Sequence, residues 1–312
     1  MKNKLFANSR IGILGKGGSG KSTITVLMAK AFQNQGFQVC VLDADSTNTG
    51  IHRALGFKNP PVSLLDYFGG PVFTGGGVTC PVDDPTPLSN AMLDLAGIPE
   101  KYFVTNQKGL FLFQLGKMGS QGPGAGCDGP ISKITRDVNV VGIGDQLVTL
   151  IDVKAGLEDT ARGVITSMDW IITIVDPTTA SVQIATDINN LISRIKAGEL
   201  PATEHLDIFE LIEMTRKTYK EARIKAMFVL LNKINNKKTE HYLIKKLKEN
   251  GLGILGTIYD DPSISLAWLK GKSLESKKAN EEIITAIKKL ERGIKKQQGT
   301  YDLEEITGIW GN

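Results

Sequence analysis

The sequence predicts an α/β protein in which helices cover both faces of a doubly wound, mostly parallel sheet. Short apolar runs recur along the 312 residues, and they are continuous rather than alternating, as in strands that are buried on both sides. Segments with the apolar spacing of amphipathic helices separate these runs. Because strands alternate with helices, neighbouring strands are expected to be parallel and joined by helical crossovers.

The expected elements follow one another in a regular order, with one interruption. Strands are expected at 11–14, 39–42, 110–115, 147–151, 170–175, 227–231 and 254–258. Helices are expected at 21–35, 158–168, 178–196, 205–222, 239–250 and 278–297. The segment 58–130 is rich in Gly and Pro and contains one expected strand. Because no internal repeat and no clear linker divides the chain, we expect one domain over 1–312. Long irregular stretches inside a compact domain are usually functional, so 58–130 is expected to be its partner or metal loop region.

Composition excludes some classes of function and favours a cytoplasmic location. The chain is 41% hydrophobic and carries a net charge of +4, which is too small to indicate a nucleic acid or membrane partner. The sequence shows no apolar signal core and no run of about 18 apolar residues, so neither export nor membrane spanning is expected. The three cysteines, Cys40, Cys80 and Cys127, are scattered and do not form the pattern of a disulfide framework, which fits a reducing compartment.

The first apolar run leads into GKGGSGKST (15–23), the pattern of a phosphate-binding loop that opens a helix. Its glycines allow the backbone N–H groups to approach phosphates, and the helix that follows adds its positive end. Lys21 is expected to contact the β- and γ-phosphates, and the Ser22 hydroxyl to bind Mg²⁺. The residues expected to contact the nucleotide here are Gly15, Lys16, Gly17, Gly18, Ser19, Gly20, Lys21, Ser22 and Thr23.

A second lysine, Lys16, distinguishes this loop from an ordinary one. The stretch KGGSGKST (16–23) resembles the deviant phosphate loop of the MinD/ParA and nitrogenase iron-protein class of ATPases, a SIMIBI-type P-loop NTPase fold. The resemblance covers roughly 10–290. It implies a homodimer in the ATP state, in which Lys16 acts with Lys21 in catalysis by contacting the phosphates bound to the partner. Hydrolysis of ATP to ADP and phosphate would then depend on dimerisation, because the cation arrives only when two chains meet.

The resemblance also assigns roles to carboxylates that follow two further strands. In VLDADSTN (41–48), it places Asp43 near the water shell of Mg²⁺ and gives Asp45 the role of positioning the attacking water. In LIDVKAGLEDTARG (150–163), it implies that Asp152 holds Mg²⁺ through water and that Gly156 moves when the γ-phosphate is lost. Carboxylates at the ends of parallel strands, beside the phosphate loop, lie where such roles are feasible.

Two further segments resemble the base-binding parts of the same class. In LLNKI (230–234), the Asn232 amide can both donate to and accept from adenine. The stretch around Asp260–Pro262 is expected to flank the base, with Pro262 in contact. The guanine pattern Asn-Lys-x-Asp fails because Asn235 occupies its last position, so ATP is expected rather than GTP.

The segment QGPGAGCDGPISKI (121–134) indicates a branch of the class. It resembles the cluster-ligand loop of nitrogenase iron proteins and the metal loop of CooC-type ATPases, which assist nickel insertion into carbon monoxide dehydrogenase. The resemblance implies a maturation ATPase with a client metalloenzyme of that kind, and Ni²⁺ or Zn²⁺ bridging two chains through Cys127. Two departures matter: Cys127 is followed by Asp128 and Gly129 rather than forming a Cys-x-Cys pair, and no cysteine follows Asp152 closely.

These departures leave alternatives open. A bridging ion would need two ligands besides the Cys127 thiolates, from Asp128, water or client thiols. Cys127 can also be an inert loop cysteine. Because the segment after Asp152 contains no cysteine, an iron-protein-like reductase with a dimer-bridging cluster is disfavoured. Cys40, within an apolar run, is expected in the core. Cys80 is expected to be an ordinary loop cysteine, with a metal contact left open.

The rival function is that of a MinD/ParA-type positioning or partition ATPase that binds membrane or DNA. The helix expected over 281–296 has an amphipathic pattern, and its apolar residues are expected to pack on the sheet rather than on a membrane. They are Ile283, Ile284, Ile287, Leu290 and Ile294. The lysine-rich stretches 216–225 and 233–248 contain interleaved acids, so a solvated face is expected there rather than a DNA-binding one.

Overall fold

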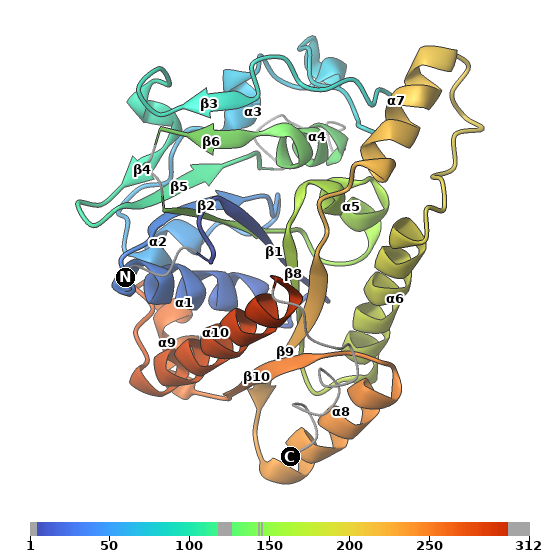
Figure 1. Cartoon of the computed structure of the whole chain (residues 1–312). Coiled ribbons are helices and arrows are strands. Elements are labelled where there is room, and N and C mark those ends of the chain that lie inside the picture. Colours follow the sequence, from blue (N-terminus) through green and yellow to red (C-terminus); the bar gives the residue numbers. More distant parts are fainter. Residues whose placement is uncertain (1–4, 118–126, 143, 145, 299–312) are drawn as a thin grey trace.

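The computed structural model describes residues 5–117, 127–142, 144 and 146–298, and strands run through its centre (Figure 1). The strands are β1 (Ser9–Gly15), β2 (Gln38–Asp43), β3 (Met92–Asp94), β4 (Val104–Thr105), β5 (Leu110–Gln114), β6 (Asn139–Val141), β7 (Leu147–Asp152), β8 (Trp170–Val175), β9 (Ala226–Ile234) and β10 (Ile254–Tyr259).

One sheet has the order β10-β9-β8-β1-β7-β2-β5-β4, and a second, small sheet pairs β3 with β6. Every pair in the large sheet is parallel except β4 with β5, which is antiparallel. The chain begins in the middle of the sheet at β1 and winds outward to both edges, so ligand-binding residues are expected where the strand order reverses. The predicted doubly wound, mostly parallel sheet is confirmed.

Helices cover this sheet on both sides. They are α1 (Lys21–Asn34), α2 (Ile51–Leu55), α3 (Leu64–Tyr67), α4 (Gly129–Asp137), α5 (Glu158–Ala161), α6 (Thr179–Lys196), α7 (Phe209–Lys220), α8 (Lys237–Glu249), α9 (Pro262–Leu269) and α10 (Lys277–Gln298). The prediction of one helix over 158–168 is wrong: α5 ends at Ala161, and a short 3₁₀ turn, Val164–Ser167, follows. Gly163, with φ of 81°, separates the two because a left-handed residue interrupts a right-handed helix.

The core lies on both faces of the sheet. In β7, Val148 and Leu150 pack on the side covered by α1 and α10, whereas Leu147 and Ile151 pack on the side covered by α4 and α6. Helices α1 and α10 lie side by side (Figure 1). In the apolar stripe of 281–296, all members are buried in this layer except Ile284, which is partly buried, and this confirms that the stripe packs on the sheet. Each fully buried side chain contributes roughly 1.5–3 kcal/mol.

The irregular segment 58–130 contributes strands to both sheets. It supplies β5, which pairs with β2, and the short strands β3 and β4, which were not predicted. Residues 118–126 within it lie outside the described part of the chain, as does the terminal stretch 299–312. Among the residues that the structure does describe, no helix combines the length and apolarity needed to cross a membrane.

Candidate functional site

Polar residues of three adjacent strands meet at the carboxyl edge of the sheet. Asp43 closes β2 and Asp152 closes β7, and the two residues are partners in the parallel register. The next strand, β1, ends at Gly15 and continues into the phosphate loop. The phosphate loop and both carboxylates therefore lie at one edge, where parallel sheets usually bind their ligands.

The loop has a backbone shape that side chains would obstruct. Gly15 has φ of 139°, and a Cβ there would lie 2.6 Å from the carbonyl oxygen of Ile174. Gly20 has φ of 96°, and a Cβ there would lie 2.2 Å from Nδ2 of Asn232. Gly20 is also the N-cap of α1 and offers no side chain to its first turn, so those N–H groups remain available to an anion.

Asp152 is held by hydroxyl groups at the start of α1. Ser22 Oγ donates to Asp152 Oδ2 at 2.6 Å, and Thr25 Oγ1 donates to Oδ1 at 3.3 Å. Asn48 Nδ2 in turn donates to Ser22 Oγ at 2.6 Å. Burial raises the pKa of Asp152 to about 6, even though the hydrogen bond from Ser22 opposes this change. A desolvated carboxylate beside a hydroxyl is a donor set that suits Mg²⁺.

Asp43 pairs with a lysine that the sequence analysis did not single out. Lys117 Nζ lies 2.7 Å from Asp43 Oδ2 and also donates to the carbonyl oxygen of Asp45. Burial raises the pKa of Asp43 to about 7, against the effect of the Lys117 ammonium. The second oxygen, Oδ1, is buried and has no hydrogen-bond partner among the described residues. No motif marks Lys117, which lies three residues after the last residue of β5, Gln114.

The remaining predicted catalytic groups are held within the chain. Asp45 Oδ1 accepts from Thr47 N at 3.0 Å and from Thr47 Oγ1 at 2.7 Å. Although burial opposes ionisation, these bonds hold the pKa of Asp45 below its usual value. Lys21 is 5% exposed, and burial lowers its pKa while the Asp152 and Asp45 carboxylates oppose that shift. Lys16 Nζ lies 3.6 Å from Asp176 Oδ2 and donates to its neighbour's carbonyl oxygen.

On the side expected to hold the base, side chains of β9 and α9 contact the loop directly, among them Lys233, whose Nζ donates to the carbonyl oxygen of Gly18 at 2.8 Å. Asn232 is 4% exposed, and its Nδ2 donates to the carbonyl oxygen of Ser19 at 2.8 Å. Its contact with adenine stays a prediction, as does that of Pro262, which is exposed at the first position of α9. The same helix brings a residue that was not predicted: Trp268 Nε1 donates to Thr23 Oγ1 at 2.9 Å.

Cys127 lies apart from these groups, exposed just before α4, and its Sγ accepts from Gly129 N at 3.4 Å. Asp128, considered above as a further metal ligand, is buried, and its Oδ2 forms an ion pair with Lys154. That oxygen is therefore not free for a metal. The described residues contain no group of three or more His, Cys, Asp or Glu side chains able to hold a metal ion. Residues 121–126 of the predicted metal loop lie outside the described residues.

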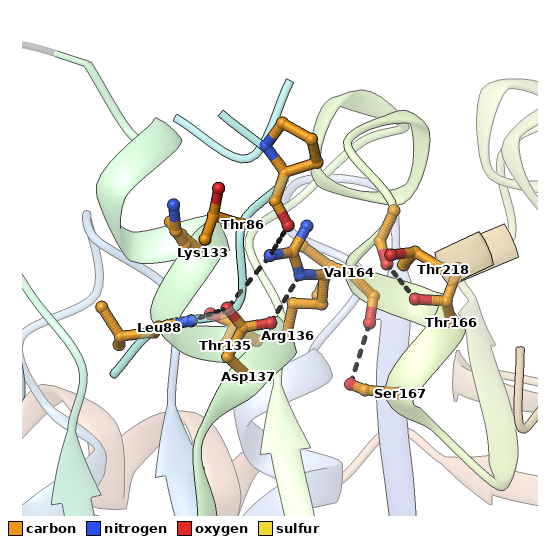
Figure 2. A network of polar contacts seen from close by, with 12 residues as sticks. Thr86, Leu88, Lys133, Thr135, Arg136, Asp137, Val164, Thr166, Ser167 and Thr218 are labelled. Atoms are coloured by element: carbon orange, nitrogen blue, oxygen red, sulfur yellow. Dashed lines mark hydrogen bonds and ion pairs between the residues drawn. The ribbon is translucent and has the colours of Figure 1, made fainter. Parts of the chain in front are cut away.

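A polar network fastens the irregular segment to α4 (Figure 2). Arg136 Nη2 donates to the carbonyl oxygen of Pro85 at 3.1 Å, and Arg136 Nε pairs with Asp137 Oδ1 at 2.6 Å. Asp137 Oδ2 accepts from Leu88 N at 2.8 Å. Because these bonds join α4 to main-chain atoms of 85–88, they fix the backbone of the irregular segment and not only its side chains.

Known proteins match this arrangement over most of its length. Residues 13–274 match the model of the CobQ/CobB/MinD/ParA nucleotide-binding domain. An uncharacterised ATP-binding protein of Methanocaldococcus jannaschii is 32% identical over 184 residues, which are 58% of this chain and 72% of that protein. The carbon monoxide dehydrogenase accessory protein CooC of Rhodospirillum rubrum is 29% identical over 186 residues, 58% of this chain and 68% of that one.

A solved structure gives the same fold. The chain is similar to the MinC:MinD cell division protein complex of Aquifex aeolicus, with a TM-score of 0.58 and 18% identity over 95% of this chain and 98% of the matched one. At that identity the likeness concerns the fold alone.

Proposed function

Because this chain belongs to the CobQ/CobB/MinD/ParA family of nucleotide-binding P-loop ATPases, we propose that it hydrolyses ATP as a homodimer and assists metal insertion into a client metalloenzyme. The main observation that supports this proposal is a set of buried polar atoms without hydrogen-bond partners at the carboxyl edge of the sheet. Asp43 Oδ1 and Ser19 Oγ are both buried there and accept or donate no hydrogen bond within the described chain. Such atoms fit a nucleotide and a cation that complete the site.

In this proposal, the residues of the site bind phosphate, bind Mg²⁺ or orient water. The loop 15–23 binds the phosphates through backbone N–H groups and Lys21, and Ser22, Asp43 and Asp152 hold Mg²⁺. When bound, Mg²⁺ neutralises phosphate charge. Asp45 orients the water that attacks the γ-phosphate, once its carboxylate turns from Thr47 towards the nucleotide.

Lys16 supports the dimeric part of the proposal by its position. In the isolated chain its ammonium pairs with Asp176 at 3.6 Å, and its side chain is 33% exposed. An exposed pair of this kind is weak, about 0–1 kcal/mol, so the lysine can leave Asp176 at small cost. A second chain would then receive this cation at its phosphates, where it stabilises the charge that develops during transfer.

The metal-related part rests on the similarity to CooC and on contacts between α4 and the segment that follows Asp152. Lys154, two residues after Asp152, pairs with Asp128, which directly follows Cys127. Ser132 of α4 donates to Asp159 at 2.7 Å. These contacts join the Cys127 loop to the segment that is expected to respond to the γ-phosphate. We propose that ATP binding and hydrolysis thereby change how Cys127 presents Ni²⁺ or Zn²⁺, bridging two chains, to a client of the carbon monoxide dehydrogenase kind.

The competing candidate is a positioning ATPase of the MinD/ParA type, which the fold also fits. The test measures mass and metal content of the chain with and without a non-hydrolysable ATP analogue, beside Cys127→Ala and the buried-thiol control Cys40→Ala. An analogue-dependent dimer that holds about one metal per two chains, lost only in Cys127→Ala, is the expected result. A dimer without metal that sediments with lipid or DNA would instead establish the positioning function.

A further inference from the structure

A second cysteine lies against the start of α4, although it is distant from Cys127 in the sequence. A Cβ on Gly129 would lie 2.6 Å from Cys80 Cβ and 2.8 Å from Cys80 Sγ. The backbone N–H of the same glycine donates to Cys127 Sγ at 3.4 Å. The two sulfur atoms therefore lie around one residue, and a side chain at 129 would displace Cys80.

Neither thiol forms a disulfide, and Cys80 Sγ accepts hydrogen bonds from the backbone N–H groups of Val82 and Asp83. Both cysteines are free, Cys127 is exposed and Cys80 is partly exposed, so an ion from solvent can reach them. The third cysteine, Cys40, is 0% exposed in the core and cannot take part. Asp128, the residue that follows Cys127, has a buried Oδ1 with no hydrogen-bond partner in the described part of the chain.

The segment that carries Cys80 is held to α4 on both sides of the cysteine. Lys133 of α4 is 4% exposed, and its ammonium donates to Thr79 Oγ1 at 2.9 Å and to the carbonyl oxygen of Asp84 at 2.9 Å. Arg136, labelled in Figure 2, adds its bond to the carbonyl oxygen of Pro85. Because these bonds hold the residues on both sides of Cys80, the backbone that carries the thiol is pre-organised, which reduces the ordering cost of binding an ion.

We propose that Cys80 is a second metal ligand of each chain, so that Cys80 and Cys127 form a two-thiolate site for a soft metal ion. This inference rests on the proposed metal-handling function and extends it. An ion that bridges two chains needs four ligands for a closed tetrahedral shell, and Cys127 alone provides two across a symmetric dimer. With Cys80 the two chains provide four sulfur ligands, and neither Asp128 nor a client thiol is required. Soft thiolate pairs favour zinc and similar thiophilic ions over Mg²⁺.

The test uses Co²⁺ alone as the probe, added to the intact chain with Mg²⁺ and a non-hydrolysable ATP analogue. The thiolate-to-cobalt absorption per bound ion grows with the number of sulfur ligands, so Cys80→Ser should retain about half of the parent's intensity. Cys40→Ala should match the parent. Retained ATP binding by Cys80→Ser shows that the variant is folded.

The outcomes separate the inference from the function on which it rests. If Cys80→Ser absorbs like the parent and only Cys127→Ser loses intensity, Cys80 is not a ligand and the proposed function stands without it. If the parent binds no Co²⁺ in any nucleotide state, the proposed function and this inference both fail. A reduction in both Cys80→Ser and Cys127→Ser, with Cys40→Ala unchanged, establishes the two-thiolate site.

Discussion

The phosphate-loop end of the molecule, formed by 15–23 with Asp43 and Asp152, differs in origin from the thiol end, formed by Cys80 and Cys127–Gly129. At the phosphate-loop end, a contiguous motif sets the geometry, because the glycines, the strand and the helix that form the site are neighbours in sequence. At the thiol end, two segments distant in sequence are held together by the hydrogen bonds of Lys133 and Arg136. A local motif can be read from the sequence, whereas a contact made by folding cannot.

The largest expected effect concerns Lys16, because it tests whether the phosphate-loop end is complete within one chain. We expect Lys16→Ala to lower the rate of ATP hydrolysis by ~10³-fold, the size of effect that a cation supplied by a partner has on phosphoryl transfer. ATP affinity should change little, since the remaining loop N–H groups and Lys21 still bind phosphates. Phosphate release and ATP titration are the measurements, with exposed Lys58→Ala as control. Hydrolysis at the parent rate would show that Lys16 does not act in trans.

Much of the phosphate-loop end could be predicted from the sequence, together with the sheet that carries it. The apolar runs that became β1, β2 and β7 were buried on both sides and left few alternatives. The raised pKa of Asp43 could not be predicted, because it depends on burial in the folded protein and on the opposing Lys117, which reaches Asp43 from the end of another strand. Nor could the position of Cys80 be predicted. No sequence periodicity encodes an irregular segment whose path is set by bonds to α4.

At the phosphate-loop end, the buried Asp152 carboxylate is expected to lower the stability of the nucleotide-free chain because it is placed to bind a ligand. Burial raises the pKa of Asp152 from 3.8 to about 6, so the stability this implies is present below about pH 4 and is lost as the pH rises through 6. That difference corresponds to ~3 kcal/mol. We expect Asp152→Asn, which still accepts from Ser22, to raise the free energy of unfolding of the nucleotide-free chain by ~2 kcal/mol at pH 7.5 and to change it little at pH 4.

Urea denaturation at the two pH values measures this effect, with exposed Asp207→Asn as control. A variant less stable than the parent at pH 7.5 would mean that the protein favours the Asp152 carboxylate even without Mg²⁺. The phosphate-loop end would then already stabilise this carboxylate without its ligand, contrary to the prediction.

A smaller effect is expected at the thiol end, where close packing rather than charge determines the geometry. A Cβ at Gly129 would lie 3.0 Å from the Cα of Cys80 as well as against its side chain, so the backbone must shift. We expect Gly129→Ala to lower the free energy of unfolding by ~1.5 kcal/mol, within the range for overpacked sites. Gly77→Ala, where a Cβ meets nothing within 4 Å, is the matched control. Thermal denaturation measures both, and equal stabilities would contradict the close approach of Cys80 to α4.

The smallest expected effect concerns Trp268, which lies on α9 and belongs to no motif. It tests whether the phosphate-loop end includes this residue. Its Nε1 donates to Thr23 Oγ1 at 2.9 Å, which leaves the Thr23 hydroxyl proton to point elsewhere, towards a phosphate. Phenylalanine keeps an aromatic ring on α9 but removes the donor, so Trp268→Phe should weaken ATP binding by about fivefold, the equivalent of ~1 kcal/mol. Calorimetric titration with ATP measures it, and Leu269→Ala, the exposed neighbour on α9, should bind as the parent does. An unchanged affinity in Trp268→Phe would restrict this end to the residues that the motif already marks.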